Sequence, residues 1–244
     1  QGFGKNVAAA WRKEGLDRLL TRVERFDVSD SGSAVFIESS LVLAAKSLRP
    51  VVRARVNYTV LPGGRLLVDT TFEPLRELPY LPRLGLQLTL SHDLCRAGWY
   101  GRGPHESYPD KKESARMGIW RSSVSDLHEP YVRPQENGAH ADTRWVSLTD
   151  DVGQGLLVCG DGFSFTAHHY TDAALTAAEH DYELSEADLT VLSLDARMGP
   201  LGSNSCGPEP LERDRLYLKE PVSFSLAIQP YNRQTGEEAD LLRD

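Results

Sequence analysis

The feature that most constrains the fold is an alternation of apolar and polar residues with a period of two. It is clearest in residues 51–60 and again in residues 65–72, where long polar side chains alternate with apolar ones. The segment Leu61-Pro62-Gly63-Gly64 between them holds residue types that turns favour. Because successive strand residues point to opposite faces of a sheet, this pattern predicts a β-hairpin with one apolar face.

The same alternation recurs along the chain, with Gly, Asp and Pro between the apolar stretches. It predicts a large antiparallel β-sandwich with one or two short helices, which makes the chain all-β. A helix is expected over residues 7–20, interrupted by Gly15, and a second over 171–180, with Thr171 as its cap. Besides the hairpin, the expected strands are 23–28, 34–43, 84–90, 117–124, 143–148, 156–158, 163–168, 190–194 and 222–228.

Composition narrows the class of protein. The chain has 244 residues, 40% of them hydrophobic, which suits a single domain with a sizeable core. Its net charge of −8 argues against a protein that binds a nucleic acid backbone. There is no apolar run long enough to cross a membrane, and the three cysteines form no C-x-x-C pair, so we expect neither a disulfide framework nor a thiolate metal site. A cytoplasmic location is the default expectation.

The stretch Gly98–Lys112 combines glycines, prolines, aromatics and ionisable groups in a way that fits a binding rim or a tight corner between elements. Its carboxylates Glu106 and Asp110 are candidates for an acid/base pair in glycoside cleavage, which needs two facing carboxylates. Because Arg102, Lys111 and Lys112 lie alongside, ion pairing that holds the loop's shape is the favoured interpretation.

Two further segments carry candidate residues. His168 and His169 are adjacent on an expected strand, so they point to opposite faces, and we expect one to be buried and the other exposed. The loop 197–208 consists mainly of small residues and turn formers, which allows close approach by another backbone or by a sugar. Within it, Cys206 is either a ligand contact or a small buried side chain.

Four ordered motifs carry a resemblance to a known family. They are Gly101-Arg102-Gly103-Pro104-His105-Glu106-Ser107-Tyr108-Pro109-Asp110-Lys111-Lys112, then Pro130–Gly138, then Asp142-Thr143-Arg144-Trp145, and finally Ser205-Cys206-Gly207-Pro208. In order and spacing the chain resembles the C-terminal domain of LacZ-type β-galactosidases, glycoside hydrolase family 2. Residues 2–6 and 11–17 are also similar to the family.

The resemblance implies a galactose-mutarotase-like supersandwich over residues 1–244, with residues 232–244 as a fraying tail. It also implies that the domain's first strands lie upstream of Gln1. Because the chain begins without Met, we expect a fragment of a longer enzyme, with a separately encoded small subunit as the alternative.

In the family the catalytic glutamates belong to a preceding barrel, so the resemblance implies no catalytic residue here and no activity of this part alone. It implies that this domain contributes a rim of the galactoside pocket, with Cys206, Asn204 and Gly2 as substrate-binding residues. Some family members carry a tryptophan at the position of Cys206.

The expected partners are the catalytic barrel of the parent chain or a large subunit, a β-galactoside, and further copies in a homo-oligomer. No nucleic acid, membrane, cofactor or metal is expected for this part. Two alternatives stay open: an aldose 1-epimerase with the same fold, and a purely structural interface module.

Overall fold

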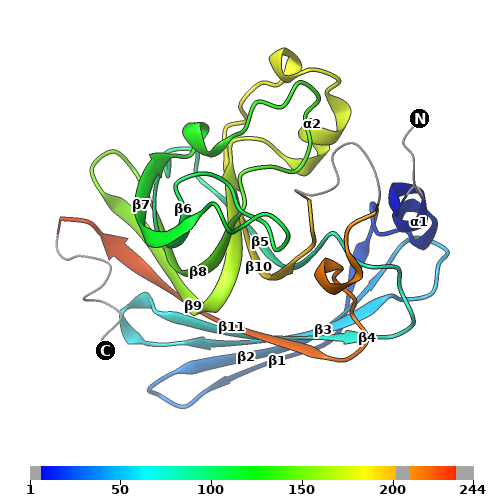
Figure 1. Ribbon diagram of the computed structural model, residues 1–244. Coiled ribbons are helices and arrows are strands. Elements are labelled where there is room, and N and C mark those ends of the chain that lie inside the picture. The colour runs from blue at the N-terminus through cyan, green and yellow to red at the C-terminus, as the bar shows by residue number, and fades with distance from the viewer. Residues whose placement is uncertain (1–6, 202–208, 235–244) are drawn as a thin grey trace. The chain divides into compact units, whose positions relative to one another are not determined.

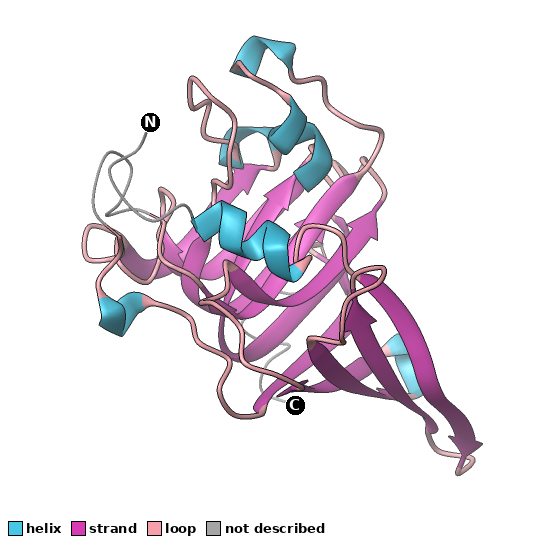
Figure 2. Ribbon diagram, turned by 90° about the vertical axis from the view of Figure 1, so that its right-hand side faces the viewer, coloured by secondary structure: helices cyan, strands magenta, loops and turns pink. Residues whose placement is uncertain are grey.

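The computed structural model describes residues 7–201 and 209–234, which divide into two compact units. Unit 1 comprises residues up to Leu84 together with Met198–Ile228, and unit 2 comprises Gly85–Arg197 and the residues from Gln229 onward. Within the described residues, eleven strands, all antiparallel where their register is given, dominate over a few short helices (Figures 1 and 2). The expected all-β antiparallel class is therefore confirmed.

Unit 1 holds a sheet of five antiparallel strands in the order β1-β2-β3-β4-β11 (Figure 1). The predicted hairpin is present as β3 and β4, joined by η1. The elements are α1 (Val7–Glu14), β1 (Leu20–Asp30), β2 (Val35–Ala44), β3 (Val52–Val60), η1 (Pro62–Gly64), β4 (Leu66–Pro74), η4 (Glu212–Asp214) and the first part of β11 (Val222–Asn232).

The first helix is shorter than the sequence predicts, because α1 ends at Glu14 and Gly15 follows with φ of 75°. Glycine adopts this left-handed conformation without steric cost and commonly ends helices there. The helix is fixed to its own unit by Trp11, whose Nε1 donates to the Tyr80 carbonyl at 2.6 Å, and by an ion pair between Glu14 and Arg76. Gly15, expected to interrupt a helix that runs to residue 20, ends the helix instead.

One face of the unit 1 sheet is apolar and the other is charged, as alternation predicts. Cross-strand partners share a face, so Ala54 on β3 and Phe72 on β4 lie on the apolar face, and both are buried. On the opposite face, Glu73 pairs with Arg55 at 2.9 Å and with Arg53 at 3.6 Å. The long cations of β3 thus interact with acids on the neighbouring strand.

Unit 2 holds the strand order β9-β8-β6-β7, with β10 paired to both β9 and β5. Its core includes large, almost inaccessible side chains of β6, β8 and β9, among them Trp99, Leu148 and Phe165. The elements are β5 (Arg83–Leu90), β6 (Arg96–Gly103), β7 (Arg116–Ser123), η2 (Ser125–Leu127), β8 (His140–Thr149), β9 (Gln154–His168), α2 (Asp172–Ala177), η3 (Asp181–Glu183), β10 (Thr190–Met198) and the end of β11.

Strand β9 and helix α2 differ in length from what the sequence predicts. The predicted strands 156–158 and 163–168 are one long strand, β9, because the residues around Gly162 continue the strand and the register with β8 shifts instead of breaking. The second helix is confirmed but short. Thr171 caps it, with its Oγ1 accepting the Ala174 N–H at 3.1 Å.

Candidate functional site

The site singled out by the sequence begins as an ordinary strand. Residues 96–103 form β6, paired on one side with β7 and on the other with β8, and the irregular part starts only at the cis bond between Gly103 and Pro104. The first half of the stretch is therefore a core strand and not a loop. A Cβ on Gly101 would lie 2.6 Å from Thr143 Oγ1, and one on Gly103 would lie 2.7 Å from the Trp120 ring, so only glycine fits at these two positions.

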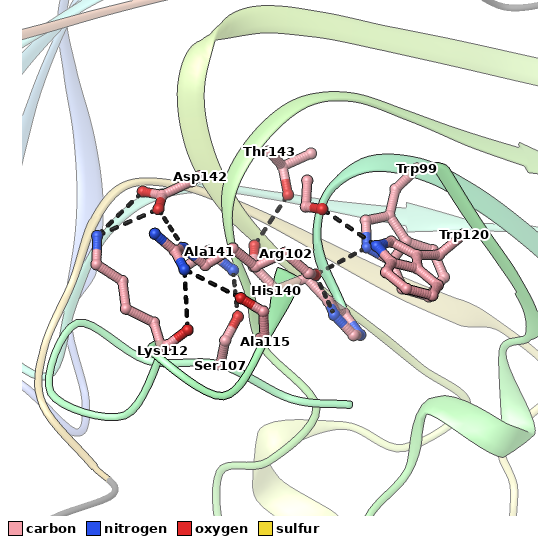
Figure 3. Close-up of polar contacts among 11 residues, drawn as sticks. Trp99, Arg102, Ser107, Lys112, Ala115, Trp120, His140, Ala141, Asp142 and Thr143 are labelled. Atoms are coloured by element: carbon pink, nitrogen blue, oxygen red, sulfur yellow. Dashed lines mark hydrogen bonds and ion pairs between the residues drawn. The ribbon is translucent and has the colours of Figure 1, made fainter. Parts of the chain in front are cut away.

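Three ring N–H groups fix the backbone where β6 ends (Figure 3). Trp120 Nε1 donates to the Gly101 carbonyl at 3.2 Å, and Trp99 Nε1 donates to the Arg102 carbonyl at 3.0 Å. His140 Nδ1 lies 3.1 Å from the same Arg102 carbonyl, so this nitrogen carries the proton. The end of the strand is held from both neighbouring strands.

The side chain of Arg102 joins three parts of unit 2 (Figure 3). Its Nε donates to Asp142 Oδ2 at 2.5 Å, and its Nη1 donates to the carbonyls of Lys112 and Ala115 at 2.9 and 3.0 Å. Lys112 Nζ also reaches Asp142, at 3.2 Å. Burial alone would raise the pKa of the Asp142 carboxyl, but hydrogen bonds and charges from Arg102 and Lys112 outweigh it and hold that pKa below its usual range.

Glu106 is the second anchored carboxylate, and its side chain is only 6% exposed. It accepts hydrogen bonds from Lys111 Nζ at 2.9 Å, from the Gly138 backbone N–H at 2.9 Å and from the Tyr131 hydroxyl. Burial opposes ionisation, yet the hydrogen bonds from Tyr131, Gly138 and Lys111 together lower the pKa of Glu106. The sequence predicted local ion pairing of the acids in this stretch with Arg102, Lys111 and Lys112, and for Glu106 the partner is Lys111.

Ser107 completes the corner by tying it to β8 (Figure 3). Its backbone N–H donates to the Ala139 carbonyl at 2.6 Å, and its Oγ accepts the Ala141 N–H at 2.9 Å. We call residues 101–112 with their partners Tyr131, Gly138 and Asp142 the arginine corner. Its ionised groups hold one another inside unit 2, which makes the corner rigid.

Sequence reasoning missed Asp142 as the partner of Arg102 and Lys112, because it lies 40 residues after Arg102 in the sequence. Its φ of 55° is unusual for a residue other than glycine and marks a special backbone position. One signal in the sequence could have indicated a further acidic partner, namely the excess of cations over acids in residues 98–112. Arg102, Lys111 and Lys112 outnumber Glu106 and Asp110, so a further acid was to be expected.

Beneath the corner lies an aromatic cluster that buries His140, which is 1% exposed. The His140 ring lies 4.4 Å from the Trp99 ring and 5.1 Å from the Phe165 ring, measured between centroids. Loss of hydration lowers the pKa of His140 to about 4, so the ring is neutral at physiological pH. It acts as a packed hydrogen-bond donor and is not exposed to a substrate.

The expectation that one of His168 and His169 is exposed is wrong, because both are buried, at 6% and 2%. His168 Nε2 lies 2.9 Å from the Asn137 carbonyl. His169 faces the Leu189 carbonyl at 3.1 Å and stacks on His92 with the ring centroids 4.1 Å apart. Both faces at this end of β9 are covered by other segments of unit 2.

The corner cannot perform glycoside cleavage by itself, since that reaction needs two carboxylates flanking a sugar. Glu106 is buried under three donors and Asp142 is paired with two cations. Among the described residues, no group of three or more His, Cys, Asp or Glu side chains is arranged to hold a metal ion. Cys95 and Cys159 do not form a disulfide.

The predicted substrate-binding residues Gly2, Asn204 and Cys206 lie outside the described residues. Their role stays a prediction. In the described part of the chain, no helix is long and apolar enough to cross a membrane.

Structural comparison finds distant similarities. A putative aldose 1-epimerase from Escherichia coli K12 matches with 10% identity and a TM-score of 0.34, over 84% of this chain and 68% of that one. A galactose mutarotase related enzyme from Lactobacillus acidophilus matches with 9% identity and a TM-score of 0.31, over 89% of this chain and 72% of that one.

Sequence comparison is far more specific. A β-galactosidase from Actinobacillus pleuropneumoniae is 33% identical over 93% of this chain, and one from Staphylococcus xylosus is 33% identical over 92%. One from Arthrobacter sp. (strain B7) is 36% identical over 83%. The chain spans only 20–22% of the length of these relatives. The family described as beta galactosidase small chain matches residues 3–228, and the chain therefore belongs to that family.

Proposed function

We propose that this chain is the part of a β-galactosidase that supports the catalytic barrel and completes the rim of the galactoside site. The full enzyme hydrolyses terminal β-D-galactosides, as in lactose breakdown, and works as a cytoplasmic homo-oligomer. The observation that carries the proposal is the family match over residues 3–228, in a chain that spans about a fifth of its relatives.

The arginine corner supports a structural share of this role. Its carboxylates Glu106 and Asp142 are held by Arg102, Lys112, Lys111, Tyr131 and Gly138, which supports the expectation that the reacting carboxylates lie elsewhere in the enzyme. The rim contact is assigned to Gly2, Asn204 and Cys206, on the strength of the family resemblance. These contacts need the barrel to be present.

Strand β1 supplies the surface for contact with the remaining part of the enzyme. All of its residues are exposed, including Val23, Phe26 and Val28, at 56–61%. By register with β2 these three side chains lie on the apolar face of the unit 1 sheet, opposite Leu41, Ser39 and Ile37. Exposed apolar surface on an edge strand is a common site of protein contact. Because about four-fifths of the relatives' length lies outside this chain, we assign this surface to that remaining part.

The test is to combine this chain with the separately expressed remainder of the enzyme. We expect the chain alone not to cleave nitrophenyl galactoside and the combination to cleave it. Phe26→Asp should weaken the association about tenfold by placing a charge in an apolar contact. Ser29→Asp is the matched control, since Ser29 is also exposed on the same strand but lies on the opposite face.

Two outcomes would contradict the proposal. Activity of the isolated chain near that of the combination would mean that it carries its own catalytic groups. Equal association of the Phe26→Asp and Ser29→Asp variants would mean that β1 is not the contact surface.

The aldose 1-epimerase alternative gains no support from the described residues. That chemistry needs accessible acid and base groups, whereas His140, His168 and His169 are buried. A mutarotation assay with galactose checks it directly, and no acceleration is expected.

A further inference from the structure

A hollow of about 280 Å³ lies within unit 2, over β6, β7 and β8. Three arginines from distant parts of the sequence line it, namely Arg96, Arg121 and Arg233, together with the hydroxyl side chains of Ser123, Ser147 and Thr149. We call it the arginine hollow. Neither the arginine corner nor the proposed galactosidase role accounts for it.

The strand register explains how these residues come together. Arg96 on β6 pairs with Ser123 on β7 and with Thr149 on β8. Two residues on, Gly98 pairs with Arg121 and Ser147 in the same way. Cross-strand partners and alternate residues share a face, so these six positions form two rows of three on one face of the sheet.

Glycine occupies the centre of the second row and therefore leaves room above the sheet. Ala97 and Trp99 on either side of Gly98 point to the opposite face and are buried there, at 4% and 1%. Ser147 and Thr149 also line the hollow, and they are only 2–3% exposed. They therefore form its buried floor. The floor is thus built from small and polar side chains.

The third arginine reaches the hollow from the end of unit 2. Arg233 follows β11, and its backbone N–H donates to the Gly153 carbonyl at 2.8 Å, which ties it to the turn between β8 and β9. Next to the hollow, Tyr231 packs with Trp145 and Leu157 in a buried cluster. The backbone of Arg233 is therefore held by its hydrogen bond to Gly153 and by the buried side chain of Tyr231, two residues earlier.

The charge around the hollow favours an anion. Two carboxylates lie near it: Asp151 accepts from Arg96 Nε at 2.8 Å, and Asp126 accepts from Ser123 Oγ at 2.6 Å. The residues that line the hollow include three arginines and no carboxylate, although the chain as a whole carries a net charge of −8. Guanidinium and hydroxyl groups together are the usual ligands of phosphate oxygens.

We propose that the arginine hollow binds a phosphate group, either as free phosphate or as a small phosphomonoester. Its volume of about 280 Å³ lies just below the usual range of about 300–1,000 Å³ for ligand pockets, which suits a small ligand. The proposal goes beyond the galactosidase role and rests on unit 2 alone.

The test is calorimetric titration of the chain with sodium phosphate at constant ionic strength, with sodium chloride as the reference, because exposed arginines attract any salt. Glucose 6-phosphate, titrated in parallel, distinguishes a phosphomonoester from free phosphate as the occupant. We expect saturable binding of at least one of the two.

Matched variants test the location. Arg233→Gln should weaken binding about tenfold, and Thr149→Val, which keeps the side-chain shape, should weaken it about threefold. Arg144→Gln is the control, since Arg144 also lies on β8 but pairs with Asp161 and does not line the hollow. Binding that is unsaturable, equal to that of chloride, or unchanged in both Arg233→Gln and Thr149→Val overturns the proposal.

Discussion

Strands β1 and β8 have similar lengths and both pair in antiparallel sheets, yet β1 is exposed along its whole length while β8 is buried along most of its own. Hydropathy does not explain the difference. Leu20 and Phe26 on β1 are 61–62% exposed, whereas His140 and Ser147 on β8 are 1–2% exposed. What differs is position, because β1 has β2 as its neighbour at the end of the strand order, and β8 lies between β6 and β9.

Burial on both faces has a chemical consequence for β8. Leu148 and Val146 face one side of the sheet and are 0% exposed, while on the other side Trp145 packs with Leu157 and Tyr231 in a buried cluster. Polar groups on such a strand must find partners inside the protein, as Thr143 does by donating to the His140 carbonyl at 3.0 Å. The stability of unit 2 should therefore depend on β8 far more than that of unit 1 depends on β1.

The largest expected effect comes from a matched pair of leucines. Leu148→Ala should lower the free energy of unfolding by about 2–5 kcal/mol, because it opens a cavity at a fully buried position. Leu20→Ala, at a position 62% exposed, should change it by less than about 0.5 kcal/mol. Urea denaturation of both variants measures the difference, and equal effects would break the comparison between the strands.

The second prediction concerns the loss of stability at low pH through His140. The pKa of His140 is about 4 in the folded chain, below its ordinary value of 6.5, so the unfolded chain binds more protons between these values and stability falls as the pH is lowered from 6.5 to 4. The loss from this residue is at most about 3 kcal/mol. Carboxyl groups such as Glu106 and Asp142, whose pKa values are lowered, lose their contribution at still lower pH.

His140→Asn should flatten the stability curve between pH 6.5 and 4, as measured by thermal unfolding across that range. A slope that is unchanged in His140→Asn would show that the buried histidine is not the titrating group.

The third prediction compares two arginines. Arg102→Ala should cost about 2 kcal/mol or more, because it removes the hydrogen bonds of Arg102 to Asp142 and to the carbonyls of Lys112 and Ala115 and leaves Lys112 as the remaining cation beside Asp142. Arg55→Ala, on the unit 1 sheet, should cost less than about 1 kcal/mol, since Arg55 is 53% exposed and pairs with Glu73 at the surface.

In the full enzyme, Arg102→Ala should lower the thermal unfolding temperature and leave the Michaelis constant unchanged. The reverse result, a higher Michaelis constant with normal stability, would mean that the arginine corner contacts substrate. It would then belong to the site and not to the scaffold.

The smallest expected effect lies outside both strands, at Cys206. In the full enzyme, Cys206→Trp should shift the affinity for lactose and for sugar acceptors by about 1 kcal/mol, the scale of one aromatic contact. Substrates with a small leaving group should change little. Equal shifts for every substrate would indicate a packing residue, and the rim assignment would be wrong.

Much of the fold could be predicted from the sequence. Alternation predicted the hairpin of β3 and β4, and the cap residue Thr171 predicted the start of α2. The first helix was predicted too long, because Gly15 ends it and does not merely interrupt it. The fusion of two predicted strands into β9 could not be foreseen, because the pairing with β8 carries the strand past Gly162.

The site was predictable where partners are close in the sequence and not where they are distant. The pair Glu106 and Lys111 followed from local spacing, whereas Asp142, Tyr131 and Gly138 reach the corner only through the fold. Burial of both His168 and His169 likewise depends on segments that alternation within one strand cannot reveal.

The late position of β11 in the sequence affects the order in which the unit 1 sheet forms as the chain leaves the ribosome. Leu66 pairs with Ile228 and Phe72 pairs with Val222, so β4 can pair with β11 only when the chain is almost complete. By then β6, β7, β8, β9 and β10 have all been made. Distant pairings of this kind slow folding and leave strand edges open in the meantime. A nascent chain that stops before residue 222 exposes the edge of β4, and the sheet of unit 1 is completed last.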